Sequence, residues 1–293
     1  MFKGSNVALI TPFKNNELDV DAYIKLIHFQ ISNGTNGLVP AGTTGESPTL
    51  SHEEHQKVID LCIKESNGKT VVIAGTGSNS TKEAISLTTH AEKAGADAAL
   101  IVTPYYNKPT QEGIYQHFKE ISISTNLPIV LYNVPGRTAS NMTALTTLSL
   151  AKKFDNIVAI KEASGDLEQV MQIIKDAPDG FDILSGDDNL TFSIMSLGAA
   201  GVISVSGQSF PNEFSAMVNH LLNGDLSLAR SIHFRLFNYT KLIFREGNPG
   251  GVKWALNHMQ IISDKLRLPL WEISDELKRL IEKEVDEIRK NSN

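Results

Sequence analysis

The sequence is poor in cysteine and contains neither a long apolar run nor a cluster of basic residues. Its one cysteine, Cys62, can form neither an intramolecular disulfide nor a cysteine-based zinc site, and we expect it to be a small buried residue in a reducing compartment. No stretch approaches the ~20 apolar residues that span a bilayer, and the first residues lack the apolar core of a signal peptide. With 27 Lys and Arg against 33 Asp and Glu, the net charge of -6 argues against nucleic-acid binding. We therefore expect a cytoplasmic protein that binds neither nucleic acid nor membranes.

Several common enzyme motifs are also missing. The chain has no Gly-x-Ser-x-Gly elbow and no Walker loop, which argues against a serine hydrolase and a P-loop NTPase. Gly75-Thr76-Gly77 lacks the third glycine of a dinucleotide-binding loop, because Ser80 occupies that position. We expect this segment to be an ordinary turn.

The sequence does contain a repeated alternation of apolar runs and helical patterns. Of its 293 residues, 41% are hydrophobic and 20% charged, as in ordinary globular proteins. Eight short apolar runs, mostly continuous, are typical of parallel strands buried on both faces. They occupy residues 6–10, 37–40, 71–74, 98–102, 128–132, 157–160, 182–184 and 201–205. Helical spacing at 19–32 and capping boxes from Ser51 to Glu54 and from Ser80 to Glu83 complete the pattern of a (β/α)8 TIM barrel.

Strand patterns stop at about residue 225. Helical patterns then occupy residues 226–244, 251–259 and 274–288. We therefore predict a barrel domain at 1–224 and a C-terminal helical appendage at 225–293 that packs on it. No Ser-, Gly- or Pro-rich linker separates the two regions, so we expect them not to move independently.

Lys161 is the strongest candidate for a catalytic residue. Reacting groups of such barrels lie at the C-terminal ends of the strands, and Lys161 follows the apolar run at 157–160. Burial disfavours the charged ammonium and makes the free amine available to attack a ketone, which gives a Schiff base. The alternatives are a solvated lysine beyond the strand and an ion pair with Glu162. Hydroxyl groups near the other strand ends favour the Schiff base, because imine formation needs proton transfer.

Other strand ends carry weaker signals. The glycine-flanked turn of Thr43 and Thr44 presents hydroxyls and N–H groups that suit a carboxylate, but an ordinary turn fits as well. Arg137 suits bidentate carboxylate binding or an exposed surface position. His52 and His55 have helical spacing but no metal-binding motif around them, so we predict no metal site.

Taken together, the strand-end motifs resemble those of the dihydrodipicolinate synthase family, within the class I pyruvate-dependent lyase and aldolase superfamily. The motifs are GTTGES at 42–47, TPYYN at 103–107, YNVPGRT at 132–138, IKEA at 160–163, SGDD at 185–188 and GVISV at 201–205. The resemblance implies condensation of pyruvate with L-aspartate 4-semialdehyde to 4-hydroxy-tetrahydrodipicolinate in lysine biosynthesis, without a metal or cofactor. It also implies a homotetramer made of two tight dimers.

The resemblance assigns roles to named residues. Lys161 would form the Schiff base with pyruvate, and Tyr132 would transfer protons, linked through Thr43 to Tyr106, which reaches in from a neighbouring subunit. Further residues would bind substrate: Thr43 and Thr44 at the pyruvate carboxylate, Arg137 at the semialdehyde carboxylate, and the backbone of Gly186 and Ile203 at the cavity wall. A monomer would then be an incomplete catalyst.

The resemblance extends to a regulatory site and has one departure. The residues that match a feedback site for lysine are Ser47, His52, His55, Asn79, Glu83 and Tyr105. The departure is Gly250-Gly251, where many relatives have an apolar residue and proline. Because glycine does not fix φ, we expect a looser turn there.

Two kinds of alternative function remain open from the sequence. N-acetylneuraminate lyase and 2-keto-3-deoxy sugar acid aldolases share the barrel and the lysine, so fold and nucleophile do not separate them from the synthase. Arg137 and Thr44 favour the synthase, because a short aldehyde acid mainly needs a carboxylate clamp, whereas a sugar needs several hydroxyl-binding groups. A non-catalytic binding barrel is the alternative from a different class.

Overall fold

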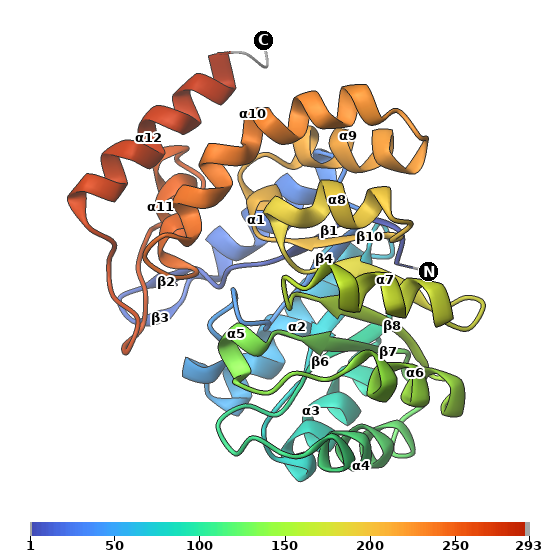
Figure 1. Ribbon diagram of the computed structural model, residues 1–293. Coiled ribbons are helices and arrows are strands. Elements are labelled where there is room, and N and C mark those ends of the chain that lie inside the picture. The colour runs from blue at the N-terminus through green and yellow to red at the C-terminus, as the bar shows by residue number, and fades with distance from the viewer. Residues whose placement is uncertain (1, 291–293) are drawn as a thin grey trace.

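A closed barrel of parallel strands forms the centre of the molecule (Figure 1). The computed structural model describes residues 2–290. The strands that form the barrel are β1 (Gly4–Ala8), β4 (Gly37–Val39), β5 (Val71–Gly75), β6 (Ala98–Val102), β7 (Ile129–Asn133), β8 (Ile157–Glu162), β9 (Asp182–Ser185) and β10 (Gly201–Ser204). Their order is β1-β10-β9-β8-β7-β6-β5-β4, and β1 pairs with both β10 and β4 to close the barrel. The predicted TIM barrel is confirmed.

Helices follow the strands and cover the outside of the barrel (Figure 1). They are α1 (Val20–Ser32), α2 (His52–Ser66), α3 (Thr81–Ala94), α4 (Gln111–Ser122), α6 (Ala144–Lys153), α7 (Leu167–Asp176), α8 (Thr191–Ser196) and α9 (Pro211–Leu222). Ser51 and Glu54 form the predicted capping box of α2. The second predicted box is wrong, because Ser80 makes no capping bond at α3 and the Glu83 carboxylate instead bonds to Ser78 and His52.

The barrel strands are apolar on both faces because two layers of core enclose them. Alternate residues point to opposite sides of a strand. Val130 and Ala159 therefore lie in the apolar cluster inside the barrel, whereas Leu131 and Ile160 lie in the cluster between strands and helices. Lys161 lies two residues after Ala159 on the same strand, so its side chain points to the same side, into the barrel. Cys62 is fully buried, as predicted, and burial raises its pKa to about 12.

A short hairpin that the apolar pattern did not predict follows β1. Its strands are β2 (Phe13–Lys14) and β3 (Glu17–Leu18), which pair antiparallel. Asn15 and Asn16 connect them with φ of 52° and 64°, and asparagine tolerates this left-handed conformation better than most residues. The Asn-Asn pair was the available signal, but strands of two residues have no measurable periodicity.

The C-terminal region consists of α10 (Leu226–Phe244), α11 (Gly250–His258) and α12 (Asp275–Lys290), within two residues of the predicted bounds. The apolar stripe of α12 is buried, and α12 lies beside α10 and α11 (Figure 1). Residue 224 falls between α9 and α10, and the division into two regions stays a prediction. Gly250 and Gly251 begin α11 rather than forming a loose turn. A Cβ on Gly251 would collide with the Ile243 backbone, so glycine allows close packing of α11 on α10.

Candidate functional site

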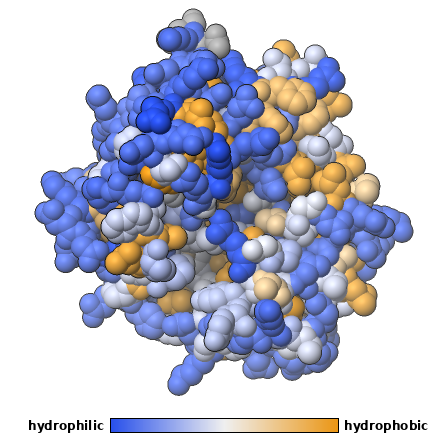
Figure 2. All heavy atoms as spheres, turned by 60° about the vertical axis from the view of Figure 1, so that its left-hand side comes forward, coloured by the Kyte–Doolittle hydropathy of each residue, from blue (hydrophilic) through white to orange (hydrophobic). Residues whose placement is uncertain are grey.

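Two adjoining cavities open at the C-terminal end of the barrel, where Figure 2 shows a hollow near the centre of the face. We call them the lysine cavity, which contains Lys161, and the side cavity, which contains Ser47 and Tyr105. The residues that line both cavities are Gly42, Thr43, Leu100, Tyr132, Val134 and Arg137. The strand ends singled out in the sequence thus meet around one connected space.

Lys161 projects from β8 into the lysine cavity and is only 5% exposed. It lies opposite Tyr132 of β7 in the sheet register, with its Nζ 4.4 Å from the centre of the Tyr132 ring. Within residues 2–290, no carboxylate lies within ion-pair distance of this Nζ. A primary amine held against an aromatic face and open to a cavity can attack a carbonyl carbon.

Glu162, the neighbour of Lys161, points to the opposite side of the strand. Its carboxylate accepts hydrogen bonds from Asn133 Nδ2 at 3.1 Å, the Ser164 N–H at 2.7 Å and Gln169 Nε2 at 3.0 Å. Burial raises the pKa of Glu162, and these donors oppose the shift. Both structural alternatives for Lys161, a solvated side chain and a pair with Glu162, are therefore wrong.

Gly186 provides the space that Lys161 occupies. A Cβ at this position would lie 3.0 Å from both Cε and Cγ of Lys161 and 2.7 Å from Cβ of Ala163. The Gly186 N–H donates to the Glu162 carbonyl at 2.7 Å, which holds the loop after β9 against β8. Any side chain here would press on the lysine.

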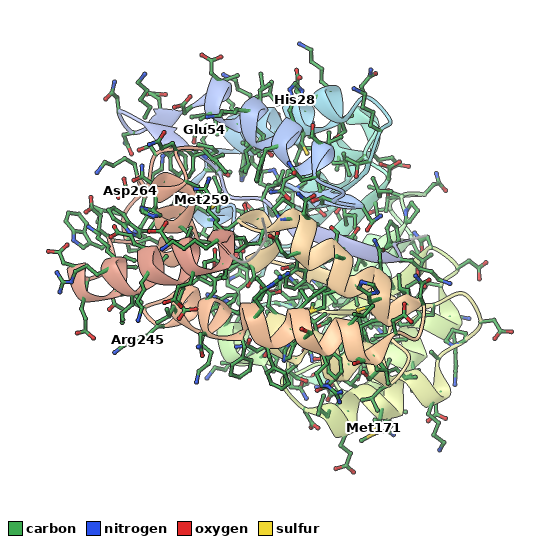
Figure 3. The ribbon with its side chains drawn as sticks, turned by 90° about the horizontal axis from the view of Figure 1, so that it is seen from above. His28, Glu54, Met171, Arg245, Met259 and Asp264 are labelled. Atoms are coloured by element: carbon green, nitrogen blue, oxygen red, sulfur yellow. The ribbon has the colours of Figure 1, made fainter. Side chains whose placement is uncertain are left out.

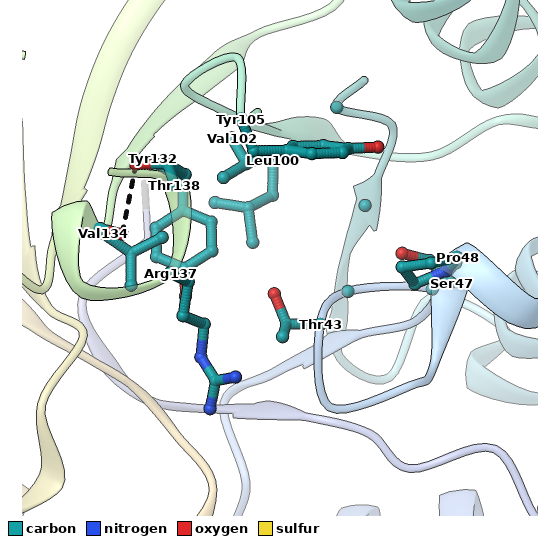
Figure 4. Close-up of a pocket in the computed structure, with 14 residues that line it drawn as sticks. Thr43, Ser47, Pro48, Leu100, Val102, Tyr105, Tyr132, Val134, Arg137 and Thr138 are labelled. Atoms are coloured by element: carbon teal, nitrogen blue, oxygen red, sulfur yellow. Dashed lines mark hydrogen bonds between the residues drawn. The ribbon is translucent and has the colours of Figure 1, made fainter. Parts of the chain in front are cut away.

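The turn after β4, residues 42–47, contributes to the lining of both cavities, and Figure 4 shows its place in the side cavity. Thr43 is half-buried there, and its side chain lies between Arg137 and Ser47 in the view of Figure 4. Thr44 is 2% exposed and its Oγ1 accepts a hydrogen bond from Asn248 Nδ2 at 2.9 Å. The turn thus presents hydroxyl groups from a fixed backbone, as carboxylate binding requires.

Arg137 lies on the short helix α5 (Pro135–Thr138) and lines both cavities. Its guanidinium extends into the open space in Figure 4. The Thr138 hydroxyl hydrogen-bonds the carbonyls of Val134 and Ser140, which fixes the turn that carries the arginine. A planar donor group at the mouth can bind a carboxylate through two parallel hydrogen bonds.

Two other predicted residues lie away from the cavity lining. Tyr106 has φ of 72° and is 89% exposed, so its side chain does not reach the cavities of its own chain. Ile203 on β10 is 1% exposed and belongs to the apolar cluster inside the barrel, whereas Val205 lines the lysine cavity.

The six residues matched to a lysine site gather beside the side cavity. Ser47 and Tyr105 line it directly, and Asn79 Nδ2 donates to the Tyr105 carbonyl at 3.2 Å. His52 Nε2 lies 2.9 Å from Glu83, and the hydrogen bonds from Ser78 and His52 lower the Glu83 pKa.

His55 reaches the same region from α2. Its Nε2 lies 2.9 Å from the carbonyl of Gly75, which lines the side cavity, and burial lowers its pKa. The residues 2–290 hold no group of three or more His, Cys, Asp or Glu side chains placed to bind a metal ion. In the same range, no helix is long and apolar enough to cross a membrane.

The C-terminal region also contributes to the lysine cavity, which the sequence patterns did not predict. Lys241, Phe244 and Arg245 line it from α10 and its end, and Asn248 lines it from the loop before α11. Lys241, Phe244 and Arg245 follow neither a strand end nor a glycine-flanked turn, so no local signal identifies them. Asn248 stands between Gly247 and Pro249, which indicates a turn but not its place at the cavity.

Known proteins similar to this chain agree with the geometry. The model of the dihydrodipicolinate synthetase family matches residues 1–288. A 4-hydroxy-tetrahydrodipicolinate synthase of Pelagibacter ubique is 57% identical over 96% of this chain and 97% of its own. The crystal structure of a dihydrodipicolinate synthase with 52% identity superposes with a TM-score of 0.96 over 98% of this chain and 99% of the other.

Two further solved structures hold ligands. A synthase of Acinetobacter baumannii complexed with pyruvate is 42% identical, with a TM-score of 0.96 over 99% of both chains. One of Cyanidioschyzon merolae with lysine bound is 39% identical, with a TM-score of 0.95 over 98% of this chain and 99% of the other. The chain therefore belongs to the dihydrodipicolinate synthetase family.

Proposed function

We propose that this chain is a 4-hydroxy-tetrahydrodipicolinate synthase that condenses pyruvate with L-aspartate 4-semialdehyde through a Schiff base on Lys161. The observation that carries the proposal is the buried Lys161 amine, which faces a cavity lined by hydroxyl groups and an arginine. The names of the relatives and the pyruvate complex of one of them support the substrate.

The chemistry follows from the groups around the amine. The neutral Lys161 amine adds to the C2 carbonyl carbon of pyruvate, and the carbinolamine loses water to give an imine. Loss of a C3 proton gives an enamine, whose C3 attacks the aldehyde carbon of the semialdehyde. Tyr132, in contact with Lys161 through its ring, is the candidate proton carrier. Thr43 lies beside it in the lining of both cavities.

Each of the two substrates has a carboxylate that needs its own hydrogen-bond donors. Thr43 and Thr44 on the fixed turn suit the carboxylate of pyruvate, which sits close to the lysine. Arg137 at the mouth suits the carboxylate of the semialdehyde. The backbone at Gly186 completes the wall, and Ile203 lies deeper in the barrel.

We infer that the working form is a homotetramer of two tight dimers, with Tyr106 completing the site of a neighbouring subunit. The 89% exposure of Tyr106 in the single chain supports this role. Sedimentation velocity tests the assembly, and a purely monomeric enzyme with full activity would refute it. The cytoplasmic location stays a prediction, which cell fractionation tests.

Feedback inhibition by lysine is the second part of the proposal. The gathering of Ser47, His52, His55, Glu83 and Tyr105 around the side cavity supports it, as does the lysine-bound relative. Lysine is titrated against the forward reaction, and we expect inhibition at millimolar concentration, on the order of a weak site's affinity. Unchanged activity there would remove the regulatory role and leave the catalytic one.

Borohydride reduction in the presence of pyruvate tests the chemistry most directly. Reduction converts the transient imine into a stable amine, which mass spectrometry detects on the intact chain and on its peptides. We expect a pyruvate-derived mass on the peptide with Lys161. An adduct on a different lysine, or none, would contradict the proposed mechanism.

A further inference from the structure

The turn at 42–47 is held in place by residues more than 200 positions further along the chain. Asn248 is 8% exposed, lines the lysine cavity and donates from Nδ2 to Thr44 Oγ1 at 2.9 Å across 204 residues of sequence. Glu46, at the other end of the turn, contacts Lys253 Nζ at 2.5 Å, and both side chains are fully buried. The Arg267 N–H donates to Glu46 Oε2 at 3.2 Å.

A second layer of contacts fixes these C-terminal residues. Lys253 Nζ also donates to the Lys265 carbonyl at 2.7 Å. The Arg267 guanidinium bonds to both carboxylate oxygens of Glu54 on α2, at 2.7 Å and 2.6 Å. Figure 3 shows the segment around Asp264 beside the helix that carries Glu54. The C-terminal region therefore fixes the turn at 42–47, while Thr43 and Thr44 of the turn line the lysine cavity.

The hydrogen bond from Asn248 determines whether the Thr44 hydroxyl can donate its proton toward the cavity. A hydroxyl has one proton to donate and two lone pairs to accept with. Since the Asn248 N–H occupies a lone pair, the Thr44 proton is free to point elsewhere. A carboxylate accepts hydrogen bonds only, so it needs that proton.

We propose that Asn248 is a positioning residue, which orients the Thr44 hydroxyl to donate to the carboxylate of the keto acid bound at Lys161. The inference rests on the proposed function for the keto acid itself. Its own support is that Asn248 Oδ1 is buried without a hydrogen-bond partner. A buried acceptor without a partner destabilises a fold, so its presence beside the cavity supports a role of this amide in the site rather than in stability.

The test is the pyruvate concentration that half-saturates borohydride trapping, read from the mass of the intact chain. Asn248→Leu removes the donor at similar size, and we expect half-saturation to rise about 10-fold, the worth of one hydrogen bond to a charged group. Thr44→Val should give a similar rise. In the double variant, half-saturation should lie less than about 2-fold above the value of either single variant, because both substitutions remove the same interaction.

Two further variants keep the test decisive. The aspartate of Asn248→Asp has the shape of asparagine, but its carboxylate only accepts hydrogen bonds, so it draws the Thr44 proton away from the cavity. This variant replaces Asn248→Leu if Asn248→Leu does not fold. Tyr239→Phe is the matched control, since it removes another buried hydrogen bond of the C-terminal region, to Ser209 Oγ at 2.6 Å. We expect it to lower Tm and leave half-saturation unchanged.

Each outcome has one meaning. Unchanged half-saturation in Asn248→Leu or Asn248→Asp, with a normal adduct in the wild type, would overturn the inference and leave the proposed function intact. Effects of Asn248→Leu and Thr44→Val that multiply in the double variant would also overturn it. Absence of an adduct in the wild type at any pyruvate concentration would instead defeat the proposed function.

Discussion

Two buried lysines, one in the barrel and one in the C-terminal region, lie in contrasting surroundings. Lys161 and Lys253 each hold Nζ 4.4 Å from the centre of an aromatic ring, Tyr132 and Phe13 respectively. Lys253 is fully buried, with a carboxylate and a carbonyl as partners. Lys161 has an aromatic face and an open cavity, and in the described part of the chain no carboxylate pairs with it.

The difference shows how a buried lysine can be suited either to act as a nucleophile or to stabilise the fold. A carboxylate at contact distance keeps a lysine charged and turns it into a structural cation. An amine that faces an open cavity without such a partner can reach a bound carbonyl group and act as a nucleophile. The direction of one carboxylate decides between the two roles. The Glu46 carboxylate contacts Lys253 Nζ, whereas the Glu162 carboxylate points away from Lys161.

Replacing Lys161 should produce the largest effect. We expect Lys161→Met to lower turnover by about 10⁴-fold or more, because the proposed nucleophile is lost, and to abolish the pyruvate adduct. Stability should stay equal or rise, since a buried amine is replaced by an apolar chain of similar length. A coupled assay and denaturant unfolding measure the two quantities. Turnover close to that of the wild type would refute the Schiff base.

Tyr132→Phe separates the ring from its hydroxyl. The ring face remains under Lys161, but the proposed proton carrier is gone, so we expect turnover to fall by about 10²- to 10³-fold. Steady-state kinetics and the rate of adduct formation provide the measurement. Tyr115→Phe on α4, outside both cavities, is the control that should behave as the wild type. An equal loss in both variants would argue against a role of the Tyr132 hydroxyl.

Lys253→Met should lower stability and leave the proposed nucleophile, Lys161, in place. It leaves Glu46 buried without its cation, and breaking a buried pair from one side costs about 3 kcal/mol or more of unfolding free energy. The pyruvate adduct should still form on Lys161 at saturating pyruvate. Adding Glu46→Leu should recover part of the loss. A variant as stable as the wild type would show that the pair contributes nothing to the fold.

The smallest effect concerns pH. Burial lowers the pKa of Lys253 to about 8, although Glu46 opposes the shift. Between pH 8 and the ordinary value of 10.5 the unfolded chain holds more protons than the folded one, so this residue makes stability rise with pH. The stability gap between wild type and Lys253→Met should widen by about 2 kcal/mol from pH 8 to 10.

Urea unfolding at several pH values measures that gap. The buried Cys62 thiol, whose pKa is raised, makes stability fall above pH 9, but it is present in both proteins and cancels in the difference. A gap that narrows as the pH rises would contradict the direction given for Lys253.

Local patterns predicted the barrel and Lys161 but not the support behind the site. Each strand appears in the sequence as an apolar run, because both of its faces are buried, and the position of Lys161 at the end of such a run was visible in the chain. Asn248 and Lys253 depend on partners 204 and 207 residues away, so no local periodicity reveals them. The space left by Gly186 appears only when β8 and β9 are in register.

The same distance in sequence has a consequence for synthesis of the protein. Thr44 leaves the ribosome early, whereas its partner Asn248 and the clamp on Glu46 leave it after most of the chain. A chain released or cleaved before residue 248 would contain Lys161, Tyr132 and Arg137 but would lack the contacts that hold the turn at 42–47. We therefore expect incomplete chains to trap pyruvate poorly, so that the proposed Schiff-base chemistry becomes available only when translation is nearly finished.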